Sequence, residues 1–206
     1  MAIAALVMAG GKATRMHSIE EKALLDVGGK PMIQRVVEAL KKSPAVDRII
    51  IAVTNNTPQT ARAASEMQTK IVVTPGEGYE SDMRYAIKAN GLSDTLVVSA
   101  DLPFITTEIV NRAVESYRSS RKPALTVMTP TETYERLASK PQYVFHIAGR
   151  DLVPIGVNIV DGKRIDEPVL EEEVLVVESD ELALNVNTAQ DLKLARKLVS
   201  SRGVEA

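Results

Sequence analysis

The chain of 206 residues contains no cysteine, no tryptophan and only two histidines, His17 and His146. Without cysteine there can be no disulfide, zinc–thiolate site, iron–sulfur cluster or thiol nucleophile. Two histidines are too few for a multi-histidine metal site, and the Gly-x-Ser-x-Gly elbow of many serine hydrolases is missing. The chemistry of this protein therefore has to come from glycine loops, carboxylates, amides and basic side chains.

Excess charge and long apolar runs are also absent. Lys and Arg number 25 against 27 for Asp and Glu, a formal net charge of −2, so no global positive field attracts nucleic acid or an anionic membrane. The apolar start at residues 1–8 lacks the basic beginning of a signal peptide and is too short for a membrane span, as are all later runs. We therefore expect a cytoplasmic protein with no membrane span and no nucleic-acid partner. A hydrophobic content of 45% is enough for a core, and residues 1–206 are expected to form a single domain.

Short apolar runs alternate with helical patterns along the first part of the chain. The expected strands are residues 3–8, 48–54, 71–74, 95–100, 124–129, 152–160 and 174–177. Apolar residues recur at helical spacing in 32–40 and 105–117. A last helix is expected to open at Thr188, where Asp191 approximates a capping box, and to give way to a polar tail at Ser200.

This alternation predicts an α/β, Rossmann-like fold with a mainly parallel sheet flanked by helices. After about residue 130 the strands follow one another without clear helices between them. We expect a small β-rich insertion there, in the C-terminal half, as a hairpin or subdomain over the sheet edge. Ligands bind such sheets at the carboxyl ends of the strands, so the loops that follow strands are the first candidates for a site.

The loop after the first strand, residues 8–16, is the most unusual of these segments. Gly10 and Gly11 allow a tight turn that aims backbone N–H groups at an anion, and Lys12 and Arg15 add positive charge. The pattern matches neither the dinucleotide fingerprint nor the P-loop. We interpret it as a phosphate cradle; a plain Gly-Gly turn with solvated basic residues is the alternative.

Two charged residues are expected to face this cradle. Lys22 comes directly before an apolar pair, so its stem can pack while its ammonium turns inward; an ordinary surface lysine is the alternative. Asp101 follows an apolar strand and reaches the same sheet edge, where its carboxylate suits Mg²⁺ bound to phosphates. A turn aspartate ahead of Pro103 is the other interpretation of Asp101.

Other polar residues follow further strands. The loop at residues 74–78 offers backbone groups to the edge of a base, with Asp82 as an acceptor, although a helix-entry turn explains it nearly as well. Asn56 offers an amide in a sequence that also suits a plain turn. Asn158 and Asn187 are amides in apolar surroundings, and each is either a ligand contact or a satisfied core amide.

Four segments together resemble the small nucleotidyltransferases in order and spacing. They are Gly10-Gly11-x-x-Thr14-Arg15-Met16, Lys22 before Leu24-Leu25, Asp101-Leu-Pro103, and Asn187-Thr188-x-x-Asp191-Leu192. Within that superfamily the chain is most similar to the archaeal GTP:adenosylcobinamide-phosphate guanylyltransferases of cobalamin biosynthesis, on residues 96–102, 152–160 and 185–195. The resemblance covers essentially the whole chain. It departs from the superfamily pattern at Ala13, where a third loop glycine is common, and at Ala23, where proline often follows the lysine.

The resemblance implies a nucleotidyltransferase fold, GTP as donor, Mg²⁺ as cofactor and a corrinoid phosphate as acceptor. An attacking phosphate monoester is already largely ionised, with a second pKa of about 6, so the scarcity of histidine is no obstacle. The residues that it places at the nucleotide are Ala9, Gly10, Gly11, Lys12, Ala13, Thr14, Arg15, Lys22, Asn56, Thr74, Gly76, Gly78 and Asp101. Those with a catalytic role are Arg15, Lys22 and Asp101, the metal ligands are Asp101 and Asn187, and the acceptor lies near Pro154, Gly156 and Asn158.

Three other interpretations stay open. A molybdenum cofactor guanylyltransferase shares the size and the glycine loop, but residues 143–150 depart from its expected acceptor segment. A sugar-phosphate nucleotidylyltransferase usually has a longer acceptor region. A non-catalytic GTP-binding module has little need of Lys22 and Asp101 together. A homodimer is left open, since no heptad or unusual apolar run indicates an interface.

Overall fold

The computed structural model describes residues 2–11, 20–137, 139–141 and 143–202. Its strands are β1 (Ile3–Met8), β2 (Val46–Thr54), β3 (Lys70–Thr74), β4 (Asp94–Ser99), β5 (Ala124–Pro130), β6 (Phe145–Ile147), β7 (Arg150–Asp161) and β8 (Glu172–Val176). Its helices are α1 (Met32–Lys41), α2 (Pro58–Glu66), α3 (Tyr79–Ala89), α4 (Thr107–Ser120), α5 (Thr131–Arg136) and α6 (Ala189–Arg202), with 3₁₀ turns η1 (Lys22–Leu24) and η2 (Gly162–Arg164). Over these described ranges, no helix is both long and apolar enough to cross a membrane.

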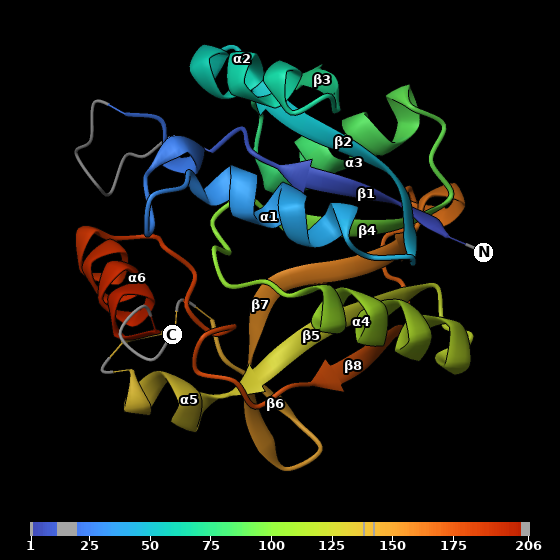
Figure 1. Ribbon diagram of the computed structural model, residues 1–206. Coiled ribbons are helices and arrows are strands. Elements are labelled where there is room, and N and C mark those ends of the chain that lie inside the picture. The colour runs from blue at the N-terminus through green and yellow to red at the C-terminus, as the bar shows by residue number, and fades with distance from the viewer. Residues whose placement is uncertain (1, 12–19, 138, 142, 203–206) are drawn as a thin grey trace.

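One sheet runs through the molecule in the order β3-β2-β1-β4-β7-β5-β8, and β6 pairs with β7 off this path (Figure 1). β1 pairs in parallel with β2 and β4, β2 with β3, and β5 with β8. β7 runs antiparallel to β4, β5 and β6. The expected α/β fold, with a mostly parallel sheet flanked by helices, is confirmed.

Helices cover both faces of the sheet (Figure 1). α1, α2 and α4 pack on one face, where Val7 of β1 and Val37 of α1 are buried in the same cluster. α3 covers the other face, and its Ile87 packs with Leu6. Leu6 and Val7 point to opposite faces because side chains alternate along a strand. α6 lies at one end of the sheet and buries Leu192 in a third cluster.

The strand register brings the functional loops to one edge. Met8, the last residue of β1, lies beside Ala52 of β2 and Ser99, the last residue of β4, so the loops after β1 and β4 start at the same level and β2 extends two residues further. β7 enters the sheet from that edge because it runs antiparallel, with Val157 opposite Val98. Gly156, near the middle of β7, therefore lies beside the carboxyl end of β4.

The insertion expected after residue 130 is present as the β6–β7 hairpin, but the prediction that it lies over the sheet edge is wrong. β7 lies inside the sheet, between β4 and β5. Its apolar side chains at 152, 153, 155, 157 and 159 are all buried. A strand that buries residues on both of its faces is stabilised in the interior of a sheet, where helices cover both sides.

Helix α6 begins after Thr188 as expected. Asp191 N–H donates to Thr188 Oγ1 at 3.2 Å and Thr188 N–H donates to Asp191 Oδ2 at 2.8 Å, which is a reciprocal capping box. The prediction of a non-helical tail from Ser200 is wrong, because α6 continues to Arg202. The hydroxyls of Ser200 and Ser201 donate to carbonyls of the preceding turn, so these polar residues are accommodated within the helix.

Candidate active site

The loop after β1 is fastened to β2. Ala9 is buried, and its N–H donates to the carbonyl of Ala52 at 2.8 Å. The hydroxyl of Thr54 donates to the carbonyl of Gly10 at 3.2 Å, and a Cβ on Gly10 would lie 2.6 Å from Thr54 Cγ2. Gly10 therefore lets the chain pass close to β2, while Gly11 lies exposed in open space. Lys12, Ala13, Thr14 and Arg15 lie outside the described residues.

Lys22, Asp101 and Asn187 come from distant segments and meet at one point. The Lys22 ammonium contacts Asp101 Oδ2 and donates to Asn187 Oδ1 at 2.7 Å. The other carboxylate oxygen, Asp101 Oδ1, is buried and has no hydrogen-bond partner among the described residues. A turn aspartate would use its oxygens on nearby backbone N–H groups. Asp101 instead keeps one oxygen on a lysine and one available to a ligand.

A second carboxylate fixes the segment that carries Asn187. Asp191 Oδ2, in the first turn of α6, accepts hydrogen bonds from the N–H groups of Asn187 at 3.0 Å and Thr188 at 2.8 Å. The amide of Asn187 is thereby presented toward Lys22. The sequence identified Asp191 only as a helix cap, and the structure gives it this further positioning role.

The donor set suits a hard cation. Asp101 and Asn187 offer carboxylate and amide oxygens, which are the ligand types that Mg²⁺ takes in proteins. They already converge on one positive charge, the Lys22 ammonium, and Asp101 Oδ1 adds an unsatisfied buried acceptor. In the described part of the chain, no three His, Asp or Glu side chains gather in a metal-binding group, at this site or elsewhere, so the protein would supply only these two ligands. The residues therefore fit a Mg²⁺ ion that draws its remaining ligands from phosphate and water.

The second glycine loop is closed by Asp82. This side chain is buried, and its Oδ1 accepts from the N–H of Gly76 at 2.8 Å and more weakly from the N–H of Glu77 at 3.4 Å. Gly76 has a positive φ of 80°, and its Cβ position lies 3.9 Å from Asn56 Nδ2. The loop and Asn56 are thus brought together as expected, but Asp82 is used to hold the loop rather than to face a ligand.

Thr74 and Gly78 frame this loop. The Thr74 side chain is buried, and its hydroxyl donates to the carbonyl of Val53 at 3.1 Å, so its contribution is to the main chain of the neighbouring strand. Gly78 adopts a φ of 124° directly before α3. Since L side chains rarely adopt that conformation, glycine is required where the loop turns into the helix.

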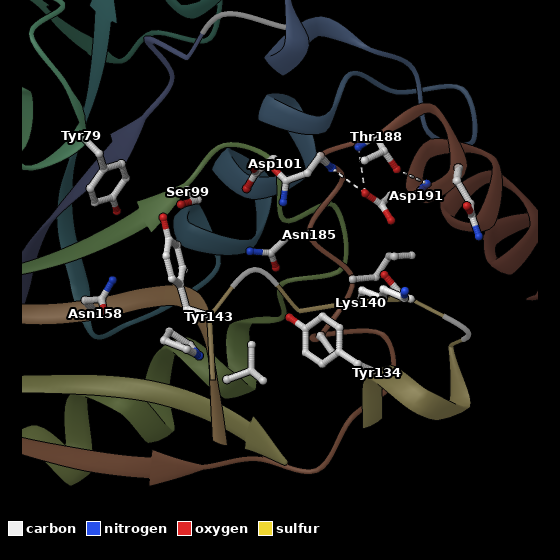
Figure 2. Close-up of a pocket in the computed structure, with 18 of the residues that line it drawn as sticks. Tyr79, Ser99, Asp101, Tyr134, Lys140, Tyr143, Asn158, Asn185, Thr188 and Asp191 are labelled. Carbon is white, nitrogen blue, oxygen red and sulfur yellow. Dashed lines mark hydrogen bonds between the residues drawn. The ribbon is translucent and has the colours of Figure 1, made fainter. Parts of the chain in front are cut away.

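A large cavity opens beside Asp101. It has a volume of about 1030 Å³ and is lined by the three residues predicted for the acceptor, Pro154, Gly156 and Asn158. Figure 2 shows Asp101, Thr188 and Asp191 along one side of this hollow. The donor-side residues Gly10, Asn56 and Gly76 are not among its described lining residues. Asp101 lines the cavity, and the residue before it, Ala100, donates its N–H to the carbonyl of Met8 at 3.1 Å, at the end of the strand that leads into the first glycine loop.

Gly156 is needed where β7 passes β4. Its φ is 82°, and a Cβ there would lie 2.9 Å from Ser99 Oγ and 3.5 Å from Asn185 Nδ2. Both neighbours line the cavity. Any larger residue would push these polar side chains out of place, so the glycine shapes the wall beside Asp101.

The sequence did not predict several cavity residues. They are Tyr79, Tyr134, Lys140, Tyr143 and Asn185. The Oδ1 atom of Asn185 is buried without a described partner, and its place in the same short motif as Asn187 was the only signal for it. The tyrosines follow no pattern in the sequence, since only the tertiary fold brings them to one cavity.

Tyr79 illustrates the environment of the cavity wall. The side chain as a whole is 46% exposed, but its hydroxyl end is enclosed. Burial raises the pKa of Tyr79 to about 12, and hydrogen bonding to Ser99 and Asn158 only partly offsets that effect. Tyr79 therefore remains a neutral phenol at neutral pH and can serve as a hydrogen-bonding wall residue.

The model of the MobA-like NTP transferase domain matches residues 5–154 of the chain. The adenosylcobinamide-phosphate guanylyltransferase of Methanocaldococcus jannaschii is 37% identical over 210 aligned residues, which cover 97% of this chain and 99% of that protein. A probable molybdenum cofactor guanylyltransferase of Pyrococcus horikoshii is 29% identical over 123 aligned residues, covering 59% of this chain and 60% of that protein.

Solved structures agree at the level of the fold. CMP:2-keto-3-deoxy-manno-octonic acid synthetase in complex with CTP matches with a TM-score of 0.77 and 16% identity, covering 98% of this chain and 100% of that chain. The 4-diphosphocytidyl-2C-methyl-D-erythritol synthase of Anaerococcus prevotii matches with a TM-score of 0.69 and 16% identity, covering 97% and 96%. Since the family model spans most of the chain and the methanogen relative aligns over nearly all of it, the protein belongs to the MobA-like NTP transferase family and is a nucleotidyltransferase.

Proposed function

We propose that the protein, as a single domain of residues 1–206, transfers GMP from GTP to adenosylcobinamide phosphate. The products are adenosylcobinamide-GDP and pyrophosphate, in cobalamin biosynthesis. The observation that carries the proposal is the meeting of Lys22, Asp101 and Asn187 at the wall of a cavity of about 1030 Å³. The near full-length similarity to a guanylyltransferase of this specificity supports the choice of donor and acceptor.

The reaction is a displacement at the α-phosphorus of GTP. An oxygen of the acceptor phosphate attacks that phosphorus, and the bond to the oxygen bridging the β-phosphorus breaks, so pyrophosphate leaves with the electron pair. Because a phosphate monoester has a second pKa of about 6, the attacking oxygen is already ionised at neutral pH and needs no general base. Catalysis then depends on alignment and charge neutralisation, which loops and cations supply.

The described residues divide these tasks. Backbone N–H groups of Gly10 and Gly11 receive the triphosphate, and the Lys22 ammonium offsets charge that develops as pyrophosphate departs. Asp101 and Asn187 would hold Mg²⁺, which when bound supplies further neutralisation of phosphate charge. The resemblance alone assigns a role at the triphosphate to Lys12, Ala13, Thr14 and Arg15.

The remaining assignments concern base and acceptor. Asn56 and the loop of residues 74–78, held by Asp82, are placed at the guanine. We assign Pro154, Gly156 and Asn158 to the acceptor, and the assignment is supported by their position on the wall of the same cavity as Asp101. Donor and acceptor would then meet over Asp101, as an in-line reaction requires.

Two alternatives are less well supported. Molybdenum cofactor guanylyltransferase is represented by a relative whose alignment covers 59% of this chain, against 97% for the corrinoid relative. A non-catalytic GTP-binding module would not need a lysine and a carboxylate held together beside the cavity of about 1030 Å³.

The deciding experiment measures pyrophosphate release from GTP and Mg²⁺ with and without adenosylcobinamide phosphate, with ATP, CTP and UTP as parallel donors. Release that needs both GTP and the corrinoid, with adenosylcobinamide-GDP identified by mass, is the expected result. No corrinoid-dependent release would overturn the proposal. Molybdopterin and sugar phosphates would then be tested as acceptors, and GTP binding without turnover on any acceptor would favour the binding module.

A further inference from the structure

Aromatic side chains are scarce in this chain and unevenly distributed. It has five tyrosines and two phenylalanines in 206 residues. Tyr79, Tyr134 and Tyr143 all line the cavity that contains Asp101, and Phe145 follows two positions after Tyr143. Three of the seven aromatic residues therefore line one cavity, and a fourth is two positions further along the chain from one of them.

The members of this group differ in exposure. Tyr134 is buried and packs with Val153 and Ala183. By contrast Tyr143, Val144 and Phe145 are 64%, 50% and 47% exposed and follow one another at the start of the β6–β7 hairpin. We call residues 143–145 the aromatic ledge. Three consecutive exposed apolar side chains of this size are unusual on a soluble surface and indicate a contact with another molecule.

The aromatic ledge is continuous with the cavity. Tyr143 belongs to both, since it lines the cavity and begins the ledge. In Figure 2 the rings of Tyr134 and Tyr143 lie on the side of the hollow away from Thr188 and Asp191, and the Tyr143 hydroxyl points toward Ser99. A ligand that reaches Asp101 through the cavity would pass the ring of Tyr143.

We propose that the aromatic ledge is the docking surface for the corrin macrocycle of the acceptor, with the acceptor phosphate extending through the cavity to Asp101. This inference rests on the proposed function. A corrinoid is a broad macrocycle with apolar methyl groups between the amide side chains of its rim, and its phosphate is carried on a side chain. Such a molecule is too wide to be enclosed with its phosphate in about 1030 Å³, so its ring has to lie against an apolar surface at the cavity mouth.

Smaller acceptors would not need this surface. A sugar phosphate or a pterin phosphate fits within the cavity itself and would leave the aromatic ledge in water. Burying the ledge against a macrocycle removes the apolar area of the ledge, and of the methyl groups that it contacts, from water. The ledge therefore provides affinity and selects acceptors by size.

The test uses Tyr143→Ala and Phe145→Ala in the full chain. The Kd for adenosylcobinamide phosphate is measured by equilibrium dialysis, read from the visible absorption of the corrinoid, and the acceptor KM is measured with saturating GTP. Each substitution is expected to raise both constants about tenfold, which corresponds to the loss of one aromatic contact, while the KM for GTP and the kcat stay within about threefold of wild type. Tyr143→Phe keeps the ring and should restore wild-type values.

The matched control is Tyr85→Ala. Tyr85 is also 46% exposed, but it lies on α3 and does not line the cavity, so its loss should leave the acceptor constants unchanged. If the wild type uses the corrinoid and both ledge variants keep its KM, the docking proposal is overturned while the proposed function stands. If the wild type does not use the corrinoid, the docking proposal and the proposed function both fail. A dimer that dissociates on Phe145→Ala in sedimentation velocity, with acceptor KM unchanged, would show that the ledge joins two copies of the chain and would also overturn the proposal.

Discussion

Lys22 and Asp101 lie 79 positions apart in the chain and form an ion pair in which their side chains are only 17% and 16% exposed. The same ammonium also holds Asn187, so one lysine occupies two of the oxygens that suit Mg²⁺ and leaves Asp101 Oδ1 without a partner among the described residues. Two positive charges cannot share these oxygens without repulsion. A triphosphate would offer the ammonium new partners and release the oxygens to the metal.

Replacement of Lys22 should therefore separate metal binding from catalysis. Lys22→Met is expected to bind Mn²⁺, a spectroscopic substitute for Mg²⁺, roughly tenfold more tightly than wild type in the absence of nucleotide, since a competing charge is gone. Turnover should fall roughly 100-fold or more through the loss of charge neutralisation. Free Mn²⁺ is measured by electron paramagnetic resonance. The control is Lys163→Met, at an exposed lysine of η2, which should bind Mn²⁺ as wild type does. Equal Mn²⁺ affinity in Lys22→Met and wild type would contradict competition between the Lys22 ammonium and the metal ion.

Asp101→Asn should remove the charge of the proposed metal ligand while keeping the shape of the side chain. We expect turnover to fall roughly 1000-fold and Mn²⁺ binding without nucleotide to be lost, because an amide carries no charge to hold the ion. The circular dichroism spectrum should match wild type, since Asn fills the same space. Appreciable turnover by this variant in the pyrophosphate assay would remove Asp101 from the mechanism.

The core strands were predictable because each is a short apolar run bounded by turn residues. β1 was expected at residues 3–8 and is found there. α2 and α3 were not predicted as helices because their apolar faces are narrow. Thr60 and Ala64 are the buried residues of α2, and a small hydroxyl and a methyl give little periodicity. Their helical state depends on packing against the sheet, which local sequence does not contain.

The sequence predicted the site residues that lie in loops at strand ends. The order of strands brought Lys22, Asp101 and Asn187 together as expected. The use of Asp82 to hold backbone N–H groups was not predictable, because the same residue type at the same place could equally face a ligand. Tyr134 and Tyr143 reach the cavity through the path of the β6–β7 connection, which no short-range pattern specifies.

Glu21 links the segment of Lys22 to α2. Its two carboxylate oxygens accept from the N–H groups of Gln59 at 2.8 Å and Thr60 at 2.7 Å, in the first turn of a helix whose own cap residue, Thr57, makes no side-chain capping bond. Glu21→Gln should lose the charge and one of these bonds, costing about 1 kcal/mol and lowering the Tm by about 2–4 °C.

The same substitution should lower kcat several-fold at temperatures well below the Tm, because η1 with Lys22 would no longer be fixed against α2. Glu66→Gln, in the last turn of α2, removes an exposed glutamate from the same helix and is the control, with neither effect expected. Thermal melts and steady-state kinetics measure the two properties. A Glu21→Gln protein with wild-type kcat would show that the contact stabilises α2 alone.

Asp82→Ala should affect the donor side selectively. Loss of the buried acceptor leaves the N–H groups of Gly76 and Glu77 without their partner and frees the loop beside Asn56. The KM for GTP is expected to rise about tenfold, while the KM for the corrinoid stays the same. Asp82→Asn keeps one acceptor oxygen and should be intermediate. A rise in the KM for the corrinoid as large as that for GTP would indicate a general defect of the fold and would contradict a selective role of Asp82 in positioning the loop.

The ionisation of Tyr134 should make the free energy of unfolding fall at alkaline pH. Burial, then the negative charges of Asp191 and Asp101, raises the pKa of Tyr134 to about 12, above its ordinary value of 10. The folded protein therefore holds a proton that the unfolded chain releases, so stability is fully present below pH 10 and falls as pH rises toward 12, by about 1.4 kcal/mol per pH unit. Tyr134→Phe cannot ionise and should show a shallower fall in urea unfolding between these values. Because the chain has no tryptophan, a near-ultraviolet titration can follow the phenols directly, and it should lose one late-titrating tyrosine in this variant. An unchanged titration curve would contradict the assignment.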